Sequence, residues 1–338
     1  MKKIKSRFIT GLSIFILALT GCAGKPEQMK PIKIAINVWP GYAHAYLAQA
    51  KGLFEKNNVE VELILTKSAP EALELFTNGK AEGCFFVFVD VIIINARGIP
   101  AKVVCVMDYS DAGDVIVGKP GIQSLAGLKG KTVSFEGINT FSHVFVLSTL
   151  AKAGIKESDV KFENIKAHDV LAALEEKRID AGHTWNPTKS QALKKGYKIL
   201  AKAGDFPGII TDILFFTPKV ISESPDKIRA IVKSLFEARD YLKGHRDEAV
   251  KIIADKMGMS KEEMAEGIEG VHQPDLKENL SLLTTTSSLY TSGKMIVDFF
   301  LKRGQLSSIV EIEDLIEPKF IKERQLQKSK LGEFAVAG

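Results

Sequence analysis

Short apolar runs rich in β-branched and aromatic residues alternate along this chain with stretches whose apolar residues recur at helical spacing. The first run, residues 32–38, is followed by the turn Trp39-Pro40-Gly41 and a helical stretch that ends at Gly52. Residues 70–78 show helical spacing with Pro at their start and Gly directly after them. Pro favours the first turn of a helix and Gly its end. The alternation predicts α/β units with parallel strands.

We expect two sets of such units, followed by a helical region. Strands are predicted at residues 32–38, 59–65, 83–88, 102–107, 131–135, 160–165, 179–184, 197–201 and 209–217. Helices between them are predicted at residues 70–78, 91–96, 141–153, 169–177 and 187–194. Further helices are predicted at residues 226–243, 246–257, 261–267 and 286–301, and their apolar stripes indicate packing against a core.

Extended crossings near residues 114–118 and 209–217 join the two sets, which predicts two lobes with a cleft and a hinge. The expected organisation is lobe 1 at residues 32–116 and 213–320, lobe 2 at 117–212 and a tail at 321–338. Two independent domains in tandem are the alternative. That alternative is disfavoured because the C-terminal helices would then have no sheet to cover.

The amino terminus has the pattern of a bacterial export signal. Its basic residues, Lys2, Lys3, Lys5 and Arg7, precede an apolar run at residues 8–19. That run is shorter than the roughly 20 residues of a membrane-spanning helix, so cleavage is favoured over a retained anchor helix. The following Leu19-Thr20-Gly21-Cys22 resembles a lipobox, which predicts a signal peptide at residues 1–21, lipidation of Cys22 and a tether at residues 22–31.

Two or more acyl chains on Cys22 would anchor the protein stably without a transmembrane helix. We therefore expect an exported protein that touches the membrane only through its lipid. The anchor would hold it to the bacterial cell membrane or outer membrane, with the folded part facing the periplasm or the exterior.

Composition narrows the classes of function. The 338 residues are 45% hydrophobic, enough for two domains with cores, and the net charge of +5 comes from Lys and Arg spread along the chain. Nucleic acid is therefore not an expected partner. The three cysteines, Cys22, Cys84 and Cys105, form no metal-ligand cluster, so no metal or other cofactor is expected. Cys84 and Cys105 lie in predicted strands, as buried free thiols or, in an oxidising compartment, as a disulfide.

Four groups of segments, in chain order, resemble one protein family. They are residues 35–37, 39–42 and 48–54; residues 128–133; residues 135–143 and 147–155; and Ile179-Asp180-Ala181 with Trp185-Asn186-Pro187. Together they resemble periplasmic binding proteins of the aliphatic sulfonate, taurine and nitrate type, over roughly residues 32–217.

The resemblance implies a type II periplasmic-binding-protein fold. In this α/β fold each of two lobes is a central, mostly parallel sheet flanked by helices, and the C-terminal helices pack on lobe 1. It also implies a monomer that is not an enzyme, a small-molecule ligand held between lobes that close about a hinge, and delivery to an ABC permease with its ATPase. Relatives bind sulfonates, nitrate, bicarbonate and pyrimidine precursors of thiamine, so the ligand is not fixed by the resemblance.

Candidate ligand-binding residues follow from the rule that open α/β sheets bind ligands at the carboxyl ends of their strands. In the first lobe this rule selects Trp39, Tyr42, Ser68, Asp90, Asp108, Ser110 and Asp114. In the second lobe it selects Asn139, Thr140, Ser142, Trp185 and Asn186.

Each candidate also has a purely structural interpretation. Thr140 and Ser142 begin a helix, where they hold an oxyanion, cap the helix, or do both. Trp185 forms a wall of the site or only packs. Asn186 precedes Pro187 and caps the next helix, with or without a ligand contact. Asp90 caps the helix that follows it or faces the ligand.

The turn position of Trp39 and Tyr42 favours exposure to the cleft. The acidic residues Asp108, Asp111 and Asp114 either line the cleft or form a solvated loop. No Arg or Lys occupies the matching strand ends, so we expect a ligand with a cationic or hydrogen-bond-donating end, such as a zwitterion, an amine or a heterocycle, rather than a simple anion.

Two other classes of function stay open. The histidines are scattered, with no Ser-His-Asp order or nucleophile elbow. Residues 83–86 lack the cysteine cluster of the fungal relatives that make a thiamine pyrimidine, so an enzyme of that type is the less favoured alternative. A lipoprotein that senses a ligand and signals to a membrane kinase is the other.

Overall fold

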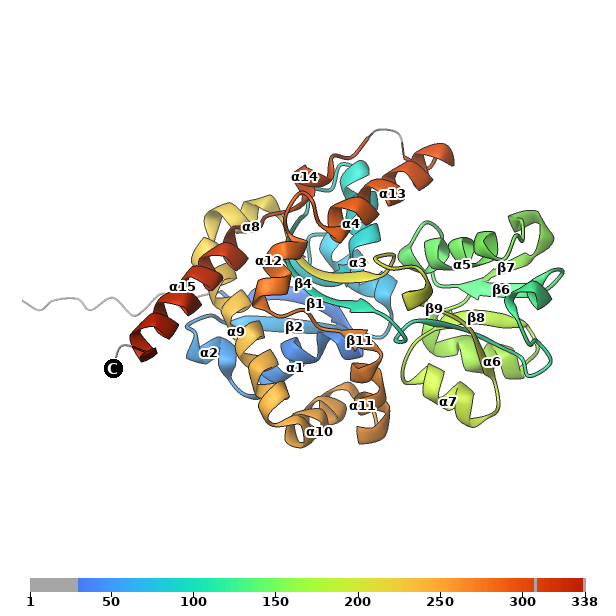
Figure 1. Ribbon diagram of the computed structural model, residues 1–338, viewed down its shortest axis with the longest axis horizontal. Coiled ribbons are helices and arrows are strands. Elements are labelled where there is room, and N and C mark those ends of the chain that lie inside the picture. Colours follow the sequence, from blue (N-terminus) through green and yellow to red (C-terminus); the bar gives the residue numbers. More distant parts are fainter. Residues whose placement is uncertain (1–29, 307–308, 337–338) are drawn as a thin grey trace, which may run out of the picture. The chain divides into compact units, whose positions relative to one another are not determined.

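The computed structural model describes residues 30–306 and 309–336, with side chains described up to residue 329. The predicted signal peptide and Cys22 lie outside the described residues, so lipidation stays a prediction. The described chain from residue 31 onward belongs to one compact unit, which contains two β-sheets (Figure 1).

The first sheet has six strands in the order β11-β4-β10-β3-β1-β2. Strands β1 (Ile32–Asn37), β2 (Val61–Thr66) and β3 (Gly83–Val87) are mutually parallel where they pair. Strand β10 (Thr211–Phe216) runs antiparallel between β3 and β4 (Lys102–Ser110), and β11 (Val271–His272) is antiparallel to β4. Every residue of β3 and of β10 is buried, as expected for central strands covered on both faces.

The second sheet has five strands in the order β7-β6-β8-β5-β9. Strand β6 (Thr132–Phe135) pairs in parallel with β7 (Lys161–Asn164) and β8 (Ala181–Thr184). Strand β5 (Val115–Gly118) is antiparallel to β8 and to β9 (Lys198–Lys202). The chain thus passes between the sheets after Ser110 and again before Thr211. We call the first sheet with its helices lobe 1 and the second sheet with its helices lobe 2.

Helices flank both sheets (Figure 1). Those that follow strands of the first sheet are α1 (Ala43–Ala50), α2 (Leu53–Lys56), α3 (Ala69–Thr77) and α4 (Phe88–Ala96). Lobe 2 has α5 (Phe141–Lys152), α6 (Val170–Glu175) and α7 (Thr188–Lys194). Short 3-10 turns lie at Pro40–Tyr42, Leu125–Leu128, Glu157–Asp159, Ala167–Asp169 and Ala203–Asp205.

The C-terminal helices add no sheet and pack on lobe 1, as expected. They are α8 (Pro218–Glu223), α9 (Pro225–Gly244), α10 (Arg246–Met257), α11 (Lys261–Glu269), α12 (Leu276–Leu282), α13 (Ser288–Lys302), α14 (Ile312–Leu315) and α15 (Lys319–Val336). Helix α9 packs on α1, α13 packs on α4, and α12, α14 and α15 reach β4. The apolar faces of these helices are buried, as their sequence stripes predicted.

Two features differ from the sequence expectation. Both sheets are mixed rather than mostly parallel, because each time the chain crosses between lobes it enters the new sheet through an antiparallel strand, β5 or β10. Strand β11 and helices α2, α8, α12, α14 and α15 were not predicted, since their segments are short or polar. In the described part of the chain no helix is both long and apolar enough to span a bilayer. Cys84 and Cys105 are buried free thiols.

Candidate functional site

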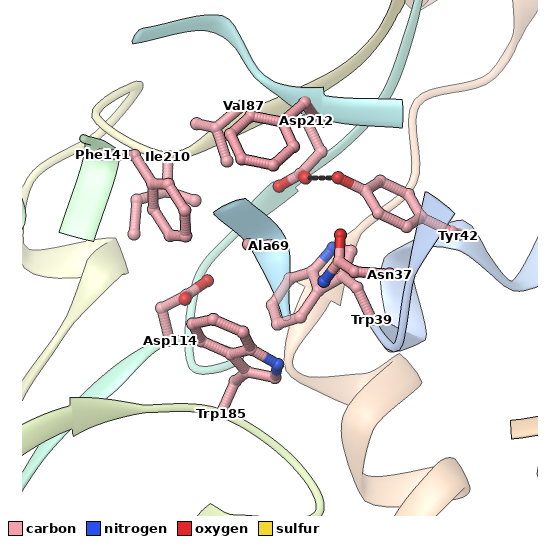
Figure 2. A pocket seen from close by; sticks show the side chains of 11 residues that line it. Asn37, Trp39, Tyr42, Ala69, Val87, Asp114, Phe141, Trp185, Ile210 and Asp212 are labelled. Carbon is pink, nitrogen blue, oxygen red and sulfur yellow. Dashed lines mark hydrogen bonds between the residues drawn. The ribbon is translucent and has the colours of Figure 1, made fainter. Parts of the chain in front are cut away.

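A cavity with about 20 Å³ of free volume, partly open to solvent, is lined by side chains from both lobes (Figure 2). Its lining residues are Asn37, Trp39, Tyr42, Ala69, Phe86, Val87, Asp114, Phe141, Trp185, Ile210 and Asp212. Aromatic rings and carboxylates dominate this set, and no Lys or Arg belongs to it. That volume has room for roughly one water molecule, so a larger solute enters only when the walls of the cavity move apart.

The lobe 1 wall is built from the turn after β1. Trp39 donates its indole N–H to Asp108, with Nε1 3.1 Å from Oδ2 and 3.3 Å from Oδ1. Tyr42 donates its hydroxyl to Asp212 Oδ1. Gly41 lies between these two aromatic residues because a side chain there would overlap the Asp108 carboxylate and the Trp39 indole. The turn therefore fixes two rings through buried acceptors.

The lobe 2 wall consists of Trp185, directly after β8, and Phe141, at the start of α5. Their ring centroids are 6.0 Å apart. Trp185 also meets Trp39 of lobe 1 edge to face, at 6.2 Å between centroids, and donates its Nε1–H to the carbonyl of Val38 at 3.2 Å. Rings from the two lobes are thus in contact across the cavity.

Two carboxylates point into the space between these rings (Figure 2). The side chains of Asp114 and Asp212 are almost fully buried, and each uses its Oδ1 on a protein donor: His183 Nε2 at 3.0 Å for Asp114, and the Tyr42 hydroxyl for Asp212. The Oδ2 atoms of both make no hydrogen bond to any described residue. Each carboxylate therefore keeps one acceptor oxygen for a ligand.

Burial and mutual repulsion govern the charge of this cluster. The pKa of Asp212 is raised well above its ordinary value by burial and then by the nearby Asp108 carboxylate, against the lowering effect of the Tyr42 hydrogen bond. The pKa of Asp108 is raised by burial and by Asp114, and lowered by the Trp39 N–H. Carboxylates packed together in an apolar site share protons until a donor or a cation compensates their charge.

A row of hydrogen bonds behind the cavity holds Asp114. Glu136 N–H donates to Ser142 Oγ at 2.8 Å, Ser142 Oγ lies 2.7 Å from His183 Nδ1, and His183 Nε2 lies 3.0 Å from Asp114 Oδ1. The Ser142 hydroxyl, already an acceptor from Glu136, donates to Nδ1, so Nε2 carries the proton that Asp114 accepts. The sequence analysis saw no such Ser-His-Asp order, because the members lie 41 and 69 residues apart.

This row does not make Ser142 an exposed nucleophile. Its side chain is fully buried and does not line the cavity. Asp114 faces the cavity at the opposite end of the row. The arrangement positions a carboxylate for binding rather than a hydroxyl for attack.

Protein acceptors take three N–H groups in the first turn of α5, and the Ser142 N–H has no acceptor among the described residues. Asp90, in the first turn of α4, accepts the Phe141 N–H with its Oδ2 at 3.3 Å. Thr140 accepts the His143 N–H with its hydroxyl at 3.5 Å and the Val144 N–H with its carbonyl at 3.0 Å. Thr140 is therefore an N-cap. Burial raises the pKa of Asp90 to about 8 in spite of its bond to Phe141 N–H.

Of the twelve predicted ligand-binding residues, four line the cavity: Trp39, Tyr42, Asp114 and Trp185. Four more lie directly behind it. Asp108 accepts the indole N–H of Trp39, and Asp90 accepts the Phe141 N–H. Ser142 belongs to the row of hydrogen bonds behind Asp114. Ser68 is buried and precedes the lining residue Ala69.

The remaining four do not line it: Ser110, Asn139, Thr140 and Asn186. Ser110 Oγ accepts the Asp114 N–H at 2.9 Å. Asn186 accepts Ser190 N–H and donates to the Glu263 carbonyl at 3.0 Å, so it joins α7 to α11. The alternative of a solvated acidic loop holds for exposed Asp111 but not for Asp108 or Asp114, which are buried.

Sequence reasoning missed Asn37, Ala69, Phe86, Val87, Phe141, Ile210 and Asp212 as lining residues. Asn37 and Val87 end strands β1 and β3, so the strand-end rule applied more widely would have found them. Asp212 lies near the beginning of β10. Because β10 is antiparallel, Asp212 pairs with Val87 at the carboxyl end of β3.

The two mixed sheets, flanked by helices and with a cavity between the lobes, define the fold of periplasmic binding proteins. The profile of the family described as NMT1/THI5 like matches residues 39–249, more than half of the chain. The chain belongs to this family. The resemblance seen in the sequence is thereby confirmed.

Individual relatives agree with this assignment. A protein of Brucella abortus (strain 2308), named only as a binding protein, is 24% identical over 317 residues, which are 92% of this chain and 97% of that relative. The periplasmic aliphatic sulphonate binding protein from Escherichia coli has a TM-score of 0.71 at 20% identity, covering 86% of this chain and 93% of the other. A ligand-binding component of an ABC-type import system from Staphylococcus aureus, solved with zinc bound, has a TM-score of 0.73 at 18% identity, covering 87% and 99%.

One similar protein is named as an enzyme. The 4-amino-5-hydroxymethyl-2-methylpyrimidine phosphate synthase of Candida albicans (strain WO-1) is 23% identical over 226 residues, 62% of this chain and 66% of the synthase. Among the residues that the structure describes here, no group of three or more His, Cys, Asp or Glu side chains is placed to hold a metal ion.

Proposed function

We propose that this protein is an exported, lipid-anchored solute-binding protein that captures a small polar metabolite between its lobes and delivers it to an ABC-type importer. The observation that carries the proposal is the cavity whose lining side chains come from both lobes. A ligand in such a cavity contacts both lobes at once, so its binding energy favours the closed arrangement.

Polar contacts between the two lobes indicate which bonds would form when the lobes close. Trp185 Nε1 donates to the Val38 carbonyl, and Asn186 Nδ2 donates to the Glu263 carbonyl. At the rim, Lys166 Nζ lies 2.9 Å from Glu71 Oε1. Exposed ion pairs of this kind contribute about 1 kcal/mol or less each.

The importer role is supported by family membership and by the likeness to a ligand-binding component of an ABC-type import system. Its partners would be a permease and an ATPase, with the binding protein acting as a monomer. A sensor for a membrane kinase would use the same cavity and closure. Uptake of the labelled ligand by cells with and without the gene distinguishes the two, because a sensor is dispensable for uptake itself.

Intrinsic fluorescence tests ligand capture directly. The chain has two tryptophans, Trp39 and Trp185, and both line the cavity. Titration of the purified protein from residue 31 onward with fractionated cell extract should change the fluorescence in a saturable way. Mass spectrometry of the bound fraction then identifies the ligand, and its recovery without chemical change is expected for transport. A converted product would support the enzyme alternative, whereas fluorescence unchanged by every fraction would contradict solute binding.

A further inference from the structure

We infer that the ligand of this cavity is a small unsaturated ring that carries a positive charge or N–H donors, and that simple anions such as sulfonates and nitrate are rejected. The inference rests on the proposed function and names the chemical class of its ligand. It depends on the α5 amino terminus, the unused carboxylate oxygens and the ring walls.

The α5 amino terminus is the feature that would otherwise attract an anion, because free N–H groups and the helix dipole favour negative charge there. In this protein Asp90 takes the Phe141 N–H, and Thr140 takes the N–H groups of His143 and Val144. The side chain of Ser142 is used by Glu136 N–H and His183. The Ser142 N–H has no acceptor among the described residues, but an anionic ligand that reached it would lie beside the carboxyl group of Asp90, which is bonded to the neighbouring Phe141 N–H.

The unused oxygens of the cavity are acceptors. Asp114 is 2% exposed and Asp212 is 3% exposed, and both direct a carboxylate into the cavity with Oδ2 unbonded to any described residue (Figure 2). A donor or cation from the ligand would form charge-assisted hydrogen bonds with these oxygens. A sulfonate or nitrate offers only further acceptors.

No basic side chain lines the cavity to compensate the charge of Asp114 and Asp212. The lining set contains no Lys or Arg. The buried Lys189 donates instead to the Ala112 carbonyl at 3.0 Å and pairs with Glu266 Oε1 at 3.4 Å. Burial and Asp108 raise the pKa of Asp212, so a bound cation would draw this carboxyl toward its ionised form.

The walls favour a flat ring. Trp39, Phe141 and Trp185 lie around the same space, with Phe86 edge-on to Phe141 at 6.1 Å between centroids. Indole and phenyl faces attract cations and stack on unsaturated rings. An alkyl amine would satisfy the carboxylates but would leave these faces without a matching surface.

Three probes that share one ring and differ in charge test the inference: benzamidine, which is a cation at neutral pH, neutral benzamide, and anionic benzenesulfonate. Thermal shift and calorimetry on the wild-type protein should rank benzamidine above benzamide, with no binding of benzenesulfonate. Asp114→Asn and Asp212→Asn should each weaken benzamidine binding by about tenfold or more, as expected for losing a charged hydrogen-bond acceptor. Asp111→Asn is the matched control, because Asp111 is exposed and pairs with Lys202.

The melting temperature of each variant without probe reports whether it folds, and the ranking in the wild type does not depend on any variant. Stronger binding of benzenesulfonate than of benzamidine would overturn the inference and leave the solute-binding proposal intact. Absence of benzamidine binding, or equal weakening by Asp111→Asn and Asp114→Asn, would also overturn it. The extract titration decides the solute-binding proposal separately.

Discussion

His183 Nε2 lies 3.0 Å from Asp114 Oδ1, and both side chains are buried. His183 belongs to β8 of lobe 2, and Asp114 lies in the first crossing between the lobes, directly before β5. The bond therefore fixes a cavity carboxylate at the point where the chain changes lobes. Ser142 completes the row by donating to Nδ1, which sets the tautomer of His183.

Replacing His183 by Ala should weaken ligand binding although His183 itself does not line the cavity. Asp114 would lose its buried donor and its fixed orientation, at a cost of about 1 to 3 kcal/mol. Calorimetric affinity and urea denaturation should both report the loss, and Ser142→Ala should show a smaller effect in the same direction. His168→Ala, at a half-exposed surface position, is the control. Unchanged affinity in His183→Ala would limit this residue to a structural role.

Trp185→Ala should weaken binding by about 1 to 3 kcal/mol, the range for removing a large buried side chain from a contact. Trp185→Phe should lose less, because the ring remains while the N–H to the Val38 carbonyl is lost. Fluorescence titration with the remaining Trp39 measures both affinities. If Trp185→Ala binds as tightly as wild type, Trp185 only packs.

The raised pKa of Asp90 predicts that the free energy of unfolding depends on pH. Burial raises its pKa to about 8 in the folded protein, compared with about 3.9 in an unfolded chain. Between these values the folded state holds the proton and the unfolded state does not, so this residue lowers the free energy of unfolding as the pH rises from about 4 to about 8. Arg97 opposes the shift and Glu136 adds to it.

Asp90→Asn removes that contribution and can still accept the Phe141 N–H. Its free energy of unfolding relative to wild type should rise by at least about 1 kcal/mol between pH 5 and pH 9, since one unit of pKa shift is worth about 1.4 kcal/mol. Urea denaturation at several pH values measures the difference. The difference cancels the contributions of buried His44 and His143, whose lowered pKa values affect both proteins equally. A pH-independent difference would contradict the assignment.

The strand-end rule found four of the eleven residues that line the cavity and missed seven, some of them for a physical reason. Trp39 and Trp185 follow strands whose carboxyl ends lie at the cavity, as parallel α/β units require. The rule missed Asp212 because this residue lies near the beginning of an antiparallel strand. A run of apolar residues does not reveal the direction of a strand. The elements themselves followed from hydrophobic period and helix caps.

The contact of Asp90 with the α5 amino terminus could not be predicted from local sequence. The Thr140 cap is visible in the sequence, but its neighbour Asp90 comes from the other lobe, 51 residues from Phe141. The row from Ser142 through His183 to Asp114 likewise joins three segments that only the fold brings together. Long-range polar contacts of this kind contribute to the charge of the site, and local motifs do not reveal them.

Lipidation is a prediction about residues outside the described part of the chain. Mass spectrometry of the protein extracted from membranes should find Cys22 as the first residue, with acyl chains attached, and Cys22→Ala should release the protein from the membrane fraction. A mature chain that begins at Met1, or a Cys22→Ala protein that stays with the membrane, would contradict the lipobox interpretation.

Small-angle scattering with and without ligand tests the central claim, that a solute is held between two lobes that close on it. The cross-lobe bonds of Trp185 to Val38 and of Asn186 to Glu263 belong to the closed arrangement. The ligand identified from the extract should therefore reduce the radius of gyration at saturation, and Trp185→Ala should require more ligand to reach the same value. A radius of gyration that is unchanged at saturating ligand would contradict capture by closure.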